Sequence, residues 1–376
     1  MKIVRLISRL FVGLLFMFSG FVKAIDPLGS TYKFTDYFRA FGMEWAEPIA
    51  LALGFLLSAA EFIIGFGLFF NLKLKFSSWG ALLFMLFFTP LTLILAIYNP
   101  VTDCGCFGDA LKITNWQTFW KNIIILIPTI IVFISKNKIK SFLTPKFQLA
   151  ILFVAFIGIN LFSYYCYSHL PIIDFRPYKI GTHIPDKMIV PEGAPQDVYE
   201  TIFKYQNLKT KEIKEFNQTN YPWQDTLNWK WVDSKSILIK EGYHAPIHDF
   251  VIESPEDGDI TDLILEDENY SFLLIAYKLP ESSTANQKEI NELANFCNKT
   301  GYKFYCVTSS GEEEINKFKS INNVQYAFCS ADEITLKTMI RSNPGLVLLK
   351  KGTVIGKWHN NDIPTIEEFK SSILKN

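Results

Sequence analysis

The sequence lacks several features that would assign a chemistry at once. Its 376 residues carry no net charge, which argues against a general nucleic-acid-binding surface. Only five histidines are present, and His244, His248 and His359 have no cysteine or carboxylate cluster at ligand spacing beside them. The chain also contains no phosphate-binding loop, no G-x-S-x-G motif and no internal repeat. Histidine-based metal sites, nucleotide sites and serine-hydrolase sites are therefore not predicted.

Charged residues are scarce in the first 170 residues, which instead contain five long apolar runs. A helix needs about 20 apolar residues to cross a bilayer, and lipid offers no hydrogen bonds to a bare backbone. We therefore expect membrane-spanning helices at roughly Ile3–Ala24, Ile49–Phe70, Trp79–Tyr98, Trp116–Ser135 and Phe147–Tyr167. The alternative for the first run is a cleaved signal peptide ending at "VKA", which its length and internal lysine disfavour.

The distribution of charge predicts an orientation for these spans. Basic residues concentrate in three segments that share one side if the spans alternate: Lys2, Arg5 and Arg9; Lys73 and Lys75; Lys136, Lys138, Lys140 and Lys146. The other side carries mainly acidic residues: Asp26, Asp36, Glu44, Glu47, Asp103 and Asp109. By the positive-inside rule the N-terminus is cytoplasmic, and the part of the chain after the fifth span lies outside. In a bacterium this means the inner membrane, with a periplasmic C-terminal domain.

One charged residue lies inside the second span. Glu61 is central in "LLSAAEFIIGFGLFF", where a charge costs about 3 kcal/mol or more unless it faces the bundle and has a partner. If the cytoplasmic ends of the first two spans are level, Arg9 and Glu61 differ in depth by about 5 Å. Arg9 is therefore the predicted partner. The pair is either a structural ion pair or part of a proton-handling or quinone-binding site.

Two cysteines lie in the loop after the third span, "NPVTDCGCFGDA". This loop faces an oxidising compartment in the predicted topology, where adjacent thiols tend to form disulfides or to be redox-active. A disulfide between Cys104 and Cys106 requires the backbone to fold back, and Gly105 gives that freedom. Strained disulfides of this kind are more easily reduced.

Three interpretations of the cysteine pair stay open. The thiols are a redox pair, a structural disulfide within the loop or with a third cysteine, or metal ligands. Cys166, near the outer end of the fifth span, is the candidate third thiol. A closed zinc site needs four ligands, and only two thiols cluster here. Asp103 and Asp109 flank the pair, and their negative charge is expected to raise thiol pKa values.

The composition changes after residue 170 to an ordinary mixture of charged and apolar residues. The segment "VYETIFKYQNLKTKEIKEF" predicts a hairpin, and "WKWVDSKSILIKEGY" predicts a second hairpin or strand pair. Strands and helices then alternate from "YSFLLIAY" to a final helix at about 363–374. We predict four parts: a four-helix bundle at 1–135, a fifth membrane helix at 136–170, a linker with β-hairpins at 171–243 and an α/β domain at 244–376.

The membrane half resembles a known family. "FSGFVKAIDPLG", the second span with its central glutamate, and "TPLTLILAIYNPVTDCGCFGDA" are similar to DoxX-like and MauE-like membrane proteins, most closely Bacteroidota-type members with an extra C-terminal domain. The resemblance implies a four-helix bundle and a link with thiol, sulfur or disulfide metabolism in the envelope, including maturation of a disulfide-rich periplasmic enzyme. The family bundle also resembles vitamin K epoxide reductases, which pass electrons from thiols to quinone. Those enzymes use C-x-x-C, whereas this chain has C-x-C.

The last 133 residues resemble peroxiredoxin-like and TlpA-like thioredoxin domains through "APIHDF…DG…ITDLI" and "SNPGLVLLKKGTVIGKW". The resemblance implies that Pro344 is the cis-proline of that fold. Where a redox-active thioredoxin carries W-C-x-x-C, this chain reads "YKLPESSTANQ". Cys297, Cys306 and Cys329 are expected to be core residues and not a dithiol. The domain is left with a groove that binds an extended peptide, or with a docking role.

The fold class that follows is an all-α membrane bundle followed by an α/β thioredoxin-like soluble domain. The function that follows is envelope thiol–disulfide redox metabolism, in which Cys104 and Cys106 exchange with a periplasmic thiol protein and pass electrons to a quinone. Glu61 would then handle protons or stabilise the bundle. The alternative is a non-catalytic scaffold or maturation factor, in which the loop is a static brace and the degenerate domain binds a client protein.

Overall fold

The computed structural model describes residues 2–101, 104–111, 113–240 and 242–373. The chain divides into two compact units, Met1–Thr182 together with Val251–Asn376, and His183–Phe250. Within the first unit, a helical region precedes an α/β region. The boundaries predicted at residues 135, 170 and 243 stay predictions.

Among the described residues, five helices are long and apolar enough to cross a membrane, as the sequence predicts. The helical region comprises α1 (Lys2–Ile25), α2 (Pro27–Ala40), η1 (Glu44–Ile49), α3 (Ala50–Phe69), α4 (Leu74–Tyr98), η2 (Gly108–Ala110), α5 (Asn115–Ser135) and α6 (Pro145–His169). The start of α2 follows from its sequence, since Asp26 accepts a hydrogen bond from Gly29 N and Pro27 occupies the first turn. Thr114 and Gln117 form a capping box at the start of α5.

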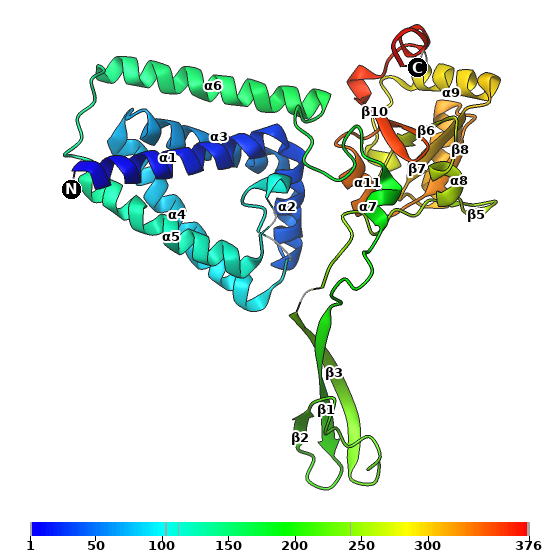
Figure 1. Cartoon of the computed structure of the whole chain (residues 1–376), viewed down its shortest axis with the longest axis horizontal. Helices are drawn as coiled ribbons and strands as arrows, with labels where there is room; N and C mark the ends of the chain where they lie inside the picture. The colour runs from blue at the N-terminus through cyan, green and yellow to red at the C-terminus, as the bar shows by residue number, and fades with distance from the viewer. Residues whose placement is uncertain (1, 102–103, 112, 241, 374–376) are drawn as a thin grey trace. The chain divides into compact units, whose positions relative to one another are not determined.

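Small residues let α1 and α3 approach closely, and Figure 1 shows these two helices side by side. A Cβ atom on Gly20 would lie 2.4 Å from the backbone nitrogen of Phe62. A Cβ atom on Gly65 would lie 2.3 Å from the backbone nitrogen of Met17. No side chain fits at either position, so the two glycines set the contact distance and the register of the two helices.

The α/β region contains a seven-stranded sheet of order β10-β9-β6-β7-β8-β4-β5. Its strands are β4 (Glu253–Ser254), β5 (Gly258–Asp259), β6 (Tyr270–Ile275), β7 (Lys303–Thr308), β8 (Ala327–Ser330), β9 (Gly345–Lys350) and β10 (Thr353–His359). The helices are α8 (Thr261–Leu265), α9 (Gln287–Thr300), α10 (Glu312–Asn322), α11 (Glu333–Met339) and α12 (Ile366–Glu368), with short turns η3 (Leu279–Glu281) and η4 (Asn360–Asp362). β6, β7 and β8 are parallel, and β9 is antiparallel to both β6 and β10. The mixed α/β architecture predicted from the alternating pattern is confirmed.

The predicted final helix is only partly regular. α12 continues into a π-helical turn, η5 (Phe369–Ile373), and the last residue of the predicted helix, Leu374, lies outside the described residues. Phe369 is fully buried and packs in the core of the sheet against α9. This single aromatic side chain explains why the chain end returns to the sheet.

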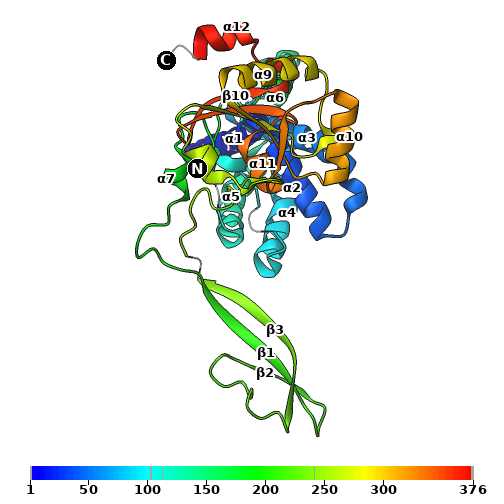
Figure 2. The same ribbon diagram turned by 90° about the vertical axis from the view of Figure 1, so that its right-hand side faces the viewer.

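The second unit contains α7 (Ile184–Met188) and a three-stranded antiparallel sheet of order β2-β1-β3, built from β1 (Val198–Asn207), β2 (Ile213–Phe216) and β3 (Trp229–Lys240). Figure 2 shows it as a long, twisted sheet. The predicted hairpin around "NLKT" is confirmed by the pairing of Phe203 with Phe216. The prediction of a second hairpin after Asn228 is wrong, because Trp229–Lys240 is one continuous strand paired with β1.

Candidate functional site

The loop between α4 and α5 folds back on itself at the cysteine pair. Gly105 has φ +66°, a left-handed conformation that favours glycine, and this turn brings the two flanking side chains to the same place. The Sγ atoms of Cys104 and Cys106 lie 3.0 Å apart, about 1 Å longer than a disulfide bond. Both are free thiols, Cys104 buried and Cys106 half-buried. The pair can therefore close to a disulfide with a small movement.

Three side chains of α1 and α2 fix the backbone of the loop. Tyr37 Oη donates a hydrogen bond of 2.8 Å to the carbonyl oxygen of Cys104. The carbonyl oxygen of Cys106 accepts hydrogen bonds from Ser19 Oγ, at 2.8 Å, and from Lys23 Nζ. The thiol loop is thus tied to the helices beneath it at both cysteines.

The buried charge of Glu61 is paired within this same network. Its Oε2 atom lies 2.8 Å from Lys23 Nζ and 2.8 Å from Ser19 Oγ, whose single proton is shared between this carboxylate and the carbonyl oxygen of Cys106. Lys23 also donates to Ser19 Oγ at 2.8 Å, so its three N–H donors all have acceptors. A carboxylate and an ammonium group are therefore connected through a hydroxyl to the main chain of Cys106.

The predicted pairing of Arg9 with Glu61 is wrong. Arg9 Nη1 donates to the carbonyl oxygens of Leu68 and Phe69, at 2.7 and 2.8 Å. The ends of the two helices are not level, because the last residue of α3 packs beside Gly13 and α1 continues beyond it. Arg9 consequently lies at the carboxyl end of α3, where a cation satisfies the last carbonyls.

The surroundings of the two thiols shift their pKa values in opposite directions. The hydrogen bond from Cys104 lowers the pKa of Cys106 to about 6, and Lys121 and Lys23 add to the effect of that bond. The same hydrogen bond, followed by burial, raises the pKa of Cys104 well above its usual value. Cys106 is therefore the thiolate at neutral pH and Cys104 the proton donor.

The expectation that flanking acids raise both pKa values is wrong for Cys106. The carboxylate of Asp109 lies 2.9 Å from Arg341 Nη2, which neutralises it. The second flanking acid, Asp103, lies outside the described residues. Lys121 Nζ lies over the ring of Phe107, 4.5 Å from its centroid, and places a further cation beside the loop.

Both cysteines line a cavity of about 250 Å³. Its walls are mainly aromatic and aliphatic side chains of α1, α2, α3, α4 and α5, with few polar groups among them. The residues that contribute chemistry are Ser19, Lys23, Glu61, Cys104, Cys106, Lys121 and Asn122. The arrangement is an apolar cavity whose lining includes a dithiol, an ammonium group and a carboxylate.

The remaining predicted residues lie elsewhere. Cys166 is buried on α6, and the described contacts do not join it to the pair. Cys297, Cys306 and Cys329 are fully buried on α9, β7 and β8, as predicted for core residues. The bond Asn343–Pro344 is cis. Among the described residues, no group of three or more His, Cys, Asp or Glu side chains is placed to hold a metal ion.

Sequence reasoning missed Lys23, Ser19, Tyr37 and Lys121. A signal for the first two was present, because Ser19 and Lys23 are four residues apart on one helix and lie on the same face. In the sequence, Lys23 stands out only as a lysine that disfavours signal-peptide cleavage. The depth of Lys23 in the membrane can be compared with that of Glu61 only when the shift of α1 along α3 is known, and the sequence does not give that shift.

Comparison with protein families bears on the same residues. Residues 1–135 match the family model described as methylamine utilisation protein MauE. The matched range contains the thiol loop, the Lys23–Glu61 pair and the cavity, so the whole candidate site lies within this MauE family domain. Residues 199–241 match a second model, described as a domain of unknown function, DUF8463. No curated protein and no solved structure matches the chain.

Proposed function

We propose that the chain is an envelope thiol–disulfide oxidoreductase whose reaction centre is Cys104 and Cys106. The observation that carries the proposal is a pair of free thiols, 3.0 Å apart, in the lining of an apolar cavity that a buried ion pair also lines. A static brace needs neither a cavity nor a thiol with a pKa near 6.

The proposed reaction transfers two electrons and two protons. A thiolate of a periplasmic partner attacks the Cys104–Cys106 disulfide, that S–S bond breaks, and a mixed disulfide forms. The second thiol of the partner then attacks the partner's sulfur in this mixed disulfide and releases the loop cysteine. The partner is left with a disulfide, and both loop cysteines are left as thiols. The loop dithiol then gives its two electrons and two protons to an apolar acceptor and closes again to a disulfide.

The residues of the cavity divide this task. Cys106, the more acidic thiol, supplies the reacting thiolate, and Cys104 retains a proton for transfer. Lys23 and Lys121 stabilise negative charge near Cys106. Glu61, connected to the loop through Ser19, accepts or returns a proton when the pair changes redox state.

A quinone ring is the acceptor that fits this cavity best. The walls are apolar and aromatic, as a flat ring requires, while Lys121, which lines the cavity beside Phe107, offers a hydrogen-bond donor to a ring oxygen. A quinone supplies the two-electron oxidising capacity that the dithiol needs. In this arrangement the apolar walls also exclude water from the thiols.

The topology of the chain supports a periplasmic location of the site in a bacterial inner membrane. The lysines of the α3–α4 and α5–α6 connections lie on one side of alternating spans, and the thiol loop lies on the other. For the α/β region we infer a thioredoxin-like plan, which is supported by parallel β6 and β7 and by a cis-proline before the antiparallel strands β9 and β10. Since it has no dithiol, it assists exchange and does not perform it.

A second candidate function is a scaffold or maturation factor, in keeping with the MauE name of the matched family. The observation that favours it is the α/β region, whose three cysteines are all fully buried. In this case the region binds a client protein, and the thiol loop does not exchange.

The test uses the full chain in proteoliposomes with a short-chain ubiquinone or menaquinone. Added dithiothreitol, or a reduced periplasmic thioredoxin, should reduce the quinone in proportion to the protein. A variant with both Cys104→Ser and Cys106→Ser is the control for direct reduction. If the wild-type protein and this variant reduce quinone at the same rate, the redox proposal is abandoned for the scaffold.

A further inference from the structure

Arg341 of the α/β region lies in the immediate surroundings of the thiol loop. It follows α11 and precedes the cis-proline, and its side chain is 8% exposed. Its Nε atom lies 2.9 Å from Asp26 Oδ2, its Nη2 atom lies 2.9 Å from Asp109 Oδ2, and its Nη1 atom donates to the carbonyl oxygen of Lys337. All three nitrogens of the guanidinium therefore have acceptors.

The two carboxylates connect Arg341 to both elements that carry the site. Asp26 caps α2, the helix whose Tyr37 binds the carbonyl oxygen of Cys104. Asp109 lies three residues after Cys106, in the turn η2. Arg341 thus fixes the far end of the loop, while Tyr37 fixes its beginning.

The charge balance makes this contact hard to replace. Burial alone lowers the pKa of a guanidinium, but the carboxylates of Asp26 and Asp109 outweigh it and raise the pKa of Arg341. Removing the cation would take from two half-buried carboxylates the positive charge that both of them bind, which is unfavourable. Removing the arginine therefore releases the loop from the α/β region.

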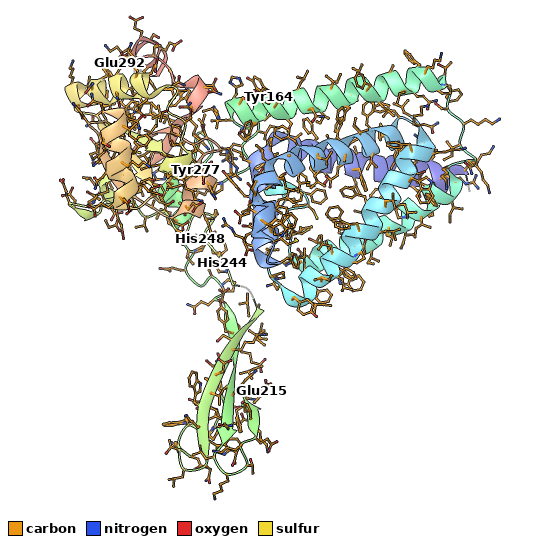
Figure 3. The ribbon with its side chains drawn as sticks, turned by 180° about the vertical axis from the view of Figure 1, so that it is seen from behind. Tyr164, Glu215, His244, His248, Tyr277 and Glu292 are labelled. Carbon is orange, nitrogen blue, oxygen red and sulfur yellow. The ribbon has the colours of Figure 1, made fainter. Side chains whose placement is uncertain are left out.

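Neighbouring side chains of the α/β region contact the same helix. Tyr277, which follows β6 and is labelled in Figure 3, lies 3.2 Å from Tyr32 of α2 between the hydroxyl oxygens. Lys337 Nζ lies 4.7 Å, and Arg341 Cζ 5.1 Å, from the ring centroid of Tyr32. The edge next to the cis-proline is therefore in contact with α2.

We propose that Arg341 is a positioning residue for the thiol pair: by binding Asp109 and Asp26 together, it keeps the loop in the geometry that brings Cys104 and Cys106 into contact. This inference rests on the proposed function, because the position of the two thiols affects activity only if they exchange. It assigns the edge of the α/β region that carries Tyr277, Lys337 and Arg341 to the chain's own thiol loop and α2. A client peptide could use that edge only after this contact opens.

The first arm of the test measures the contact without any redox chemistry. Tyr32→Cys and Tyr277→Cys are introduced together into the full chain with Cys104→Ser and Cys106→Ser, and a bis-maleimide is added in proteoliposomes. The yield of the crosslink should be high with Arg341 and should fall at least about fivefold with Arg341→Gln. The reason is that loss of the Arg341 ion pairs should also loosen the neighbouring contact between Tyr277 and α2. Arg39→Gln removes an exposed arginine–carboxylate pair of α2 and is the matched control. Equal crosslinking with and without Arg341 overturns the proposal.

The second arm measures the equilibrium of the Cys104–Cys106 pair with glutathione, by alkylation and mass spectrometry. Arg341→Gln and Asp109→Asn should each shift it about fivefold toward the dithiol, because a loosened loop lowers the effective concentration of one thiol beside the other. The double variant should shift it no further, because both changes remove one interaction. Arg341→Lys should be intermediate, and Arg39→Gln should match the wild type. If Arg341→Gln does not fold, Asp109→Asn carries the test.

The two arms separate the proposal from the function on which it rests. The positioning role is overturned if the equilibrium of the Cys104–Cys106 pair with glutathione does not change in Arg341→Gln, Arg341→Lys and Asp109→Asn. This holds even if the protein is a working oxidoreductase. A wild-type pair that never exchanges with glutathione overturns the proposed function. The crosslinking arm then still decides whether Arg341 fixes the loop to the α/β region.

Discussion

The same residue type has opposite properties in two regions of this protein. In the loop, Cys104 and Cys106 lie together at a cavity, and the pKa of Cys106 falls to about 6. In the α/β region, burial raises the pKa of Cys297 to about 12 and of Cys329 to about 11. A cysteine is reactive where a hydrogen-bond donor and a cation lie beside its sulfur and a cavity reaches it. Elsewhere it serves as a small apolar core residue.

The largest expected effect is the loss of electron transfer on changing either loop cysteine. Cys104→Ser and Cys106→Ser should each reduce thiol-dependent quinone reduction to the background rate, because a two-electron exchange needs both sulfurs. Cys297→Ser, in the buried set, should leave the rate per folded molecule unchanged. Turnover in proteoliposomes, normalised to folded protein, measures all three. Equal loss in the buried variant would remove the distinction between the two regions.

The next largest effect concerns the buried ion pair beneath the loop. Lys23→Met leaves the Glu61 carboxylate without its cation and should cost about 3–5 kcal/mol of unfolding free energy. Arg39→Gln, in an exposed pair on α2, should cost about 0–1 kcal/mol. Denaturant unfolding in detergent micelles compares them. The double variant Lys23→Met with Glu61→Leu should recover part of the loss, whereas an additive loss would contradict the pairing.

The thiols should also differ in their pH dependence. Because the pKa of Cys106 is lowered to about 6, its thiolate dominates above that pH and the thiol below it. Alkylation of reduced protein by iodoacetamide should therefore rise with pH, with a midpoint at about 6, and level off by neutral pH. Cys297, with its raised pKa, should react only after unfolding. Peptide mass spectrometry follows both sites, and a Cys106 midpoint near that of a free thiol would contradict the assignment.

The smallest effect tests the turn that brings the thiols together. Gly105 and Gly42 both have φ +66°, so alanine at either position should cost about 1 kcal/mol for the backbone alone. A Cβ atom at Gly105 would lie 2.9 Å from Lys33 Cγ. A Cβ atom at Gly42 would have no neighbouring atom within 4 Å. Gly105→Ala should therefore cost a few tenths more, as measured by thermal unfolding. It should also slow disulfide closure, while Gly42→Ala should not.

Much of the fold was readable from the sequence. Five spans followed from apolar run length, and the alternation of strands and helices after residue 268 followed from turn residues and periodicity. The long strand β3 was misread, because its bulges near Asp233 and Leu238 interrupt the alternation of side chains that a single strand would show. Local pattern thus gave the elements, and pairing decided how they combine.

The site was only half predictable, for a different reason. Cys104, Cys106, Gly105 and Glu61 were found because their residue types are unusual where they occur. The partner of Glu61 was missed, because glycine contacts between α1 and α3 set an offset that no single helix reveals. Arg341 was missed as well, since its partner Asp109 is 232 residues away in the chain.

The most direct test of the central claim is the capture of a partner on the loop cysteines in cells. Cells expressing Cys104→Ser or Cys106→Ser are treated with acid and an alkylating agent, and mixed disulfides are identified by mass spectrometry. The proposed function predicts a periplasmic thiol protein bound through the remaining loop cysteine in at least one variant, and none through Cys297. A wild-type pair that is always fully oxidised, with no mixed disulfide in either variant, would contradict it.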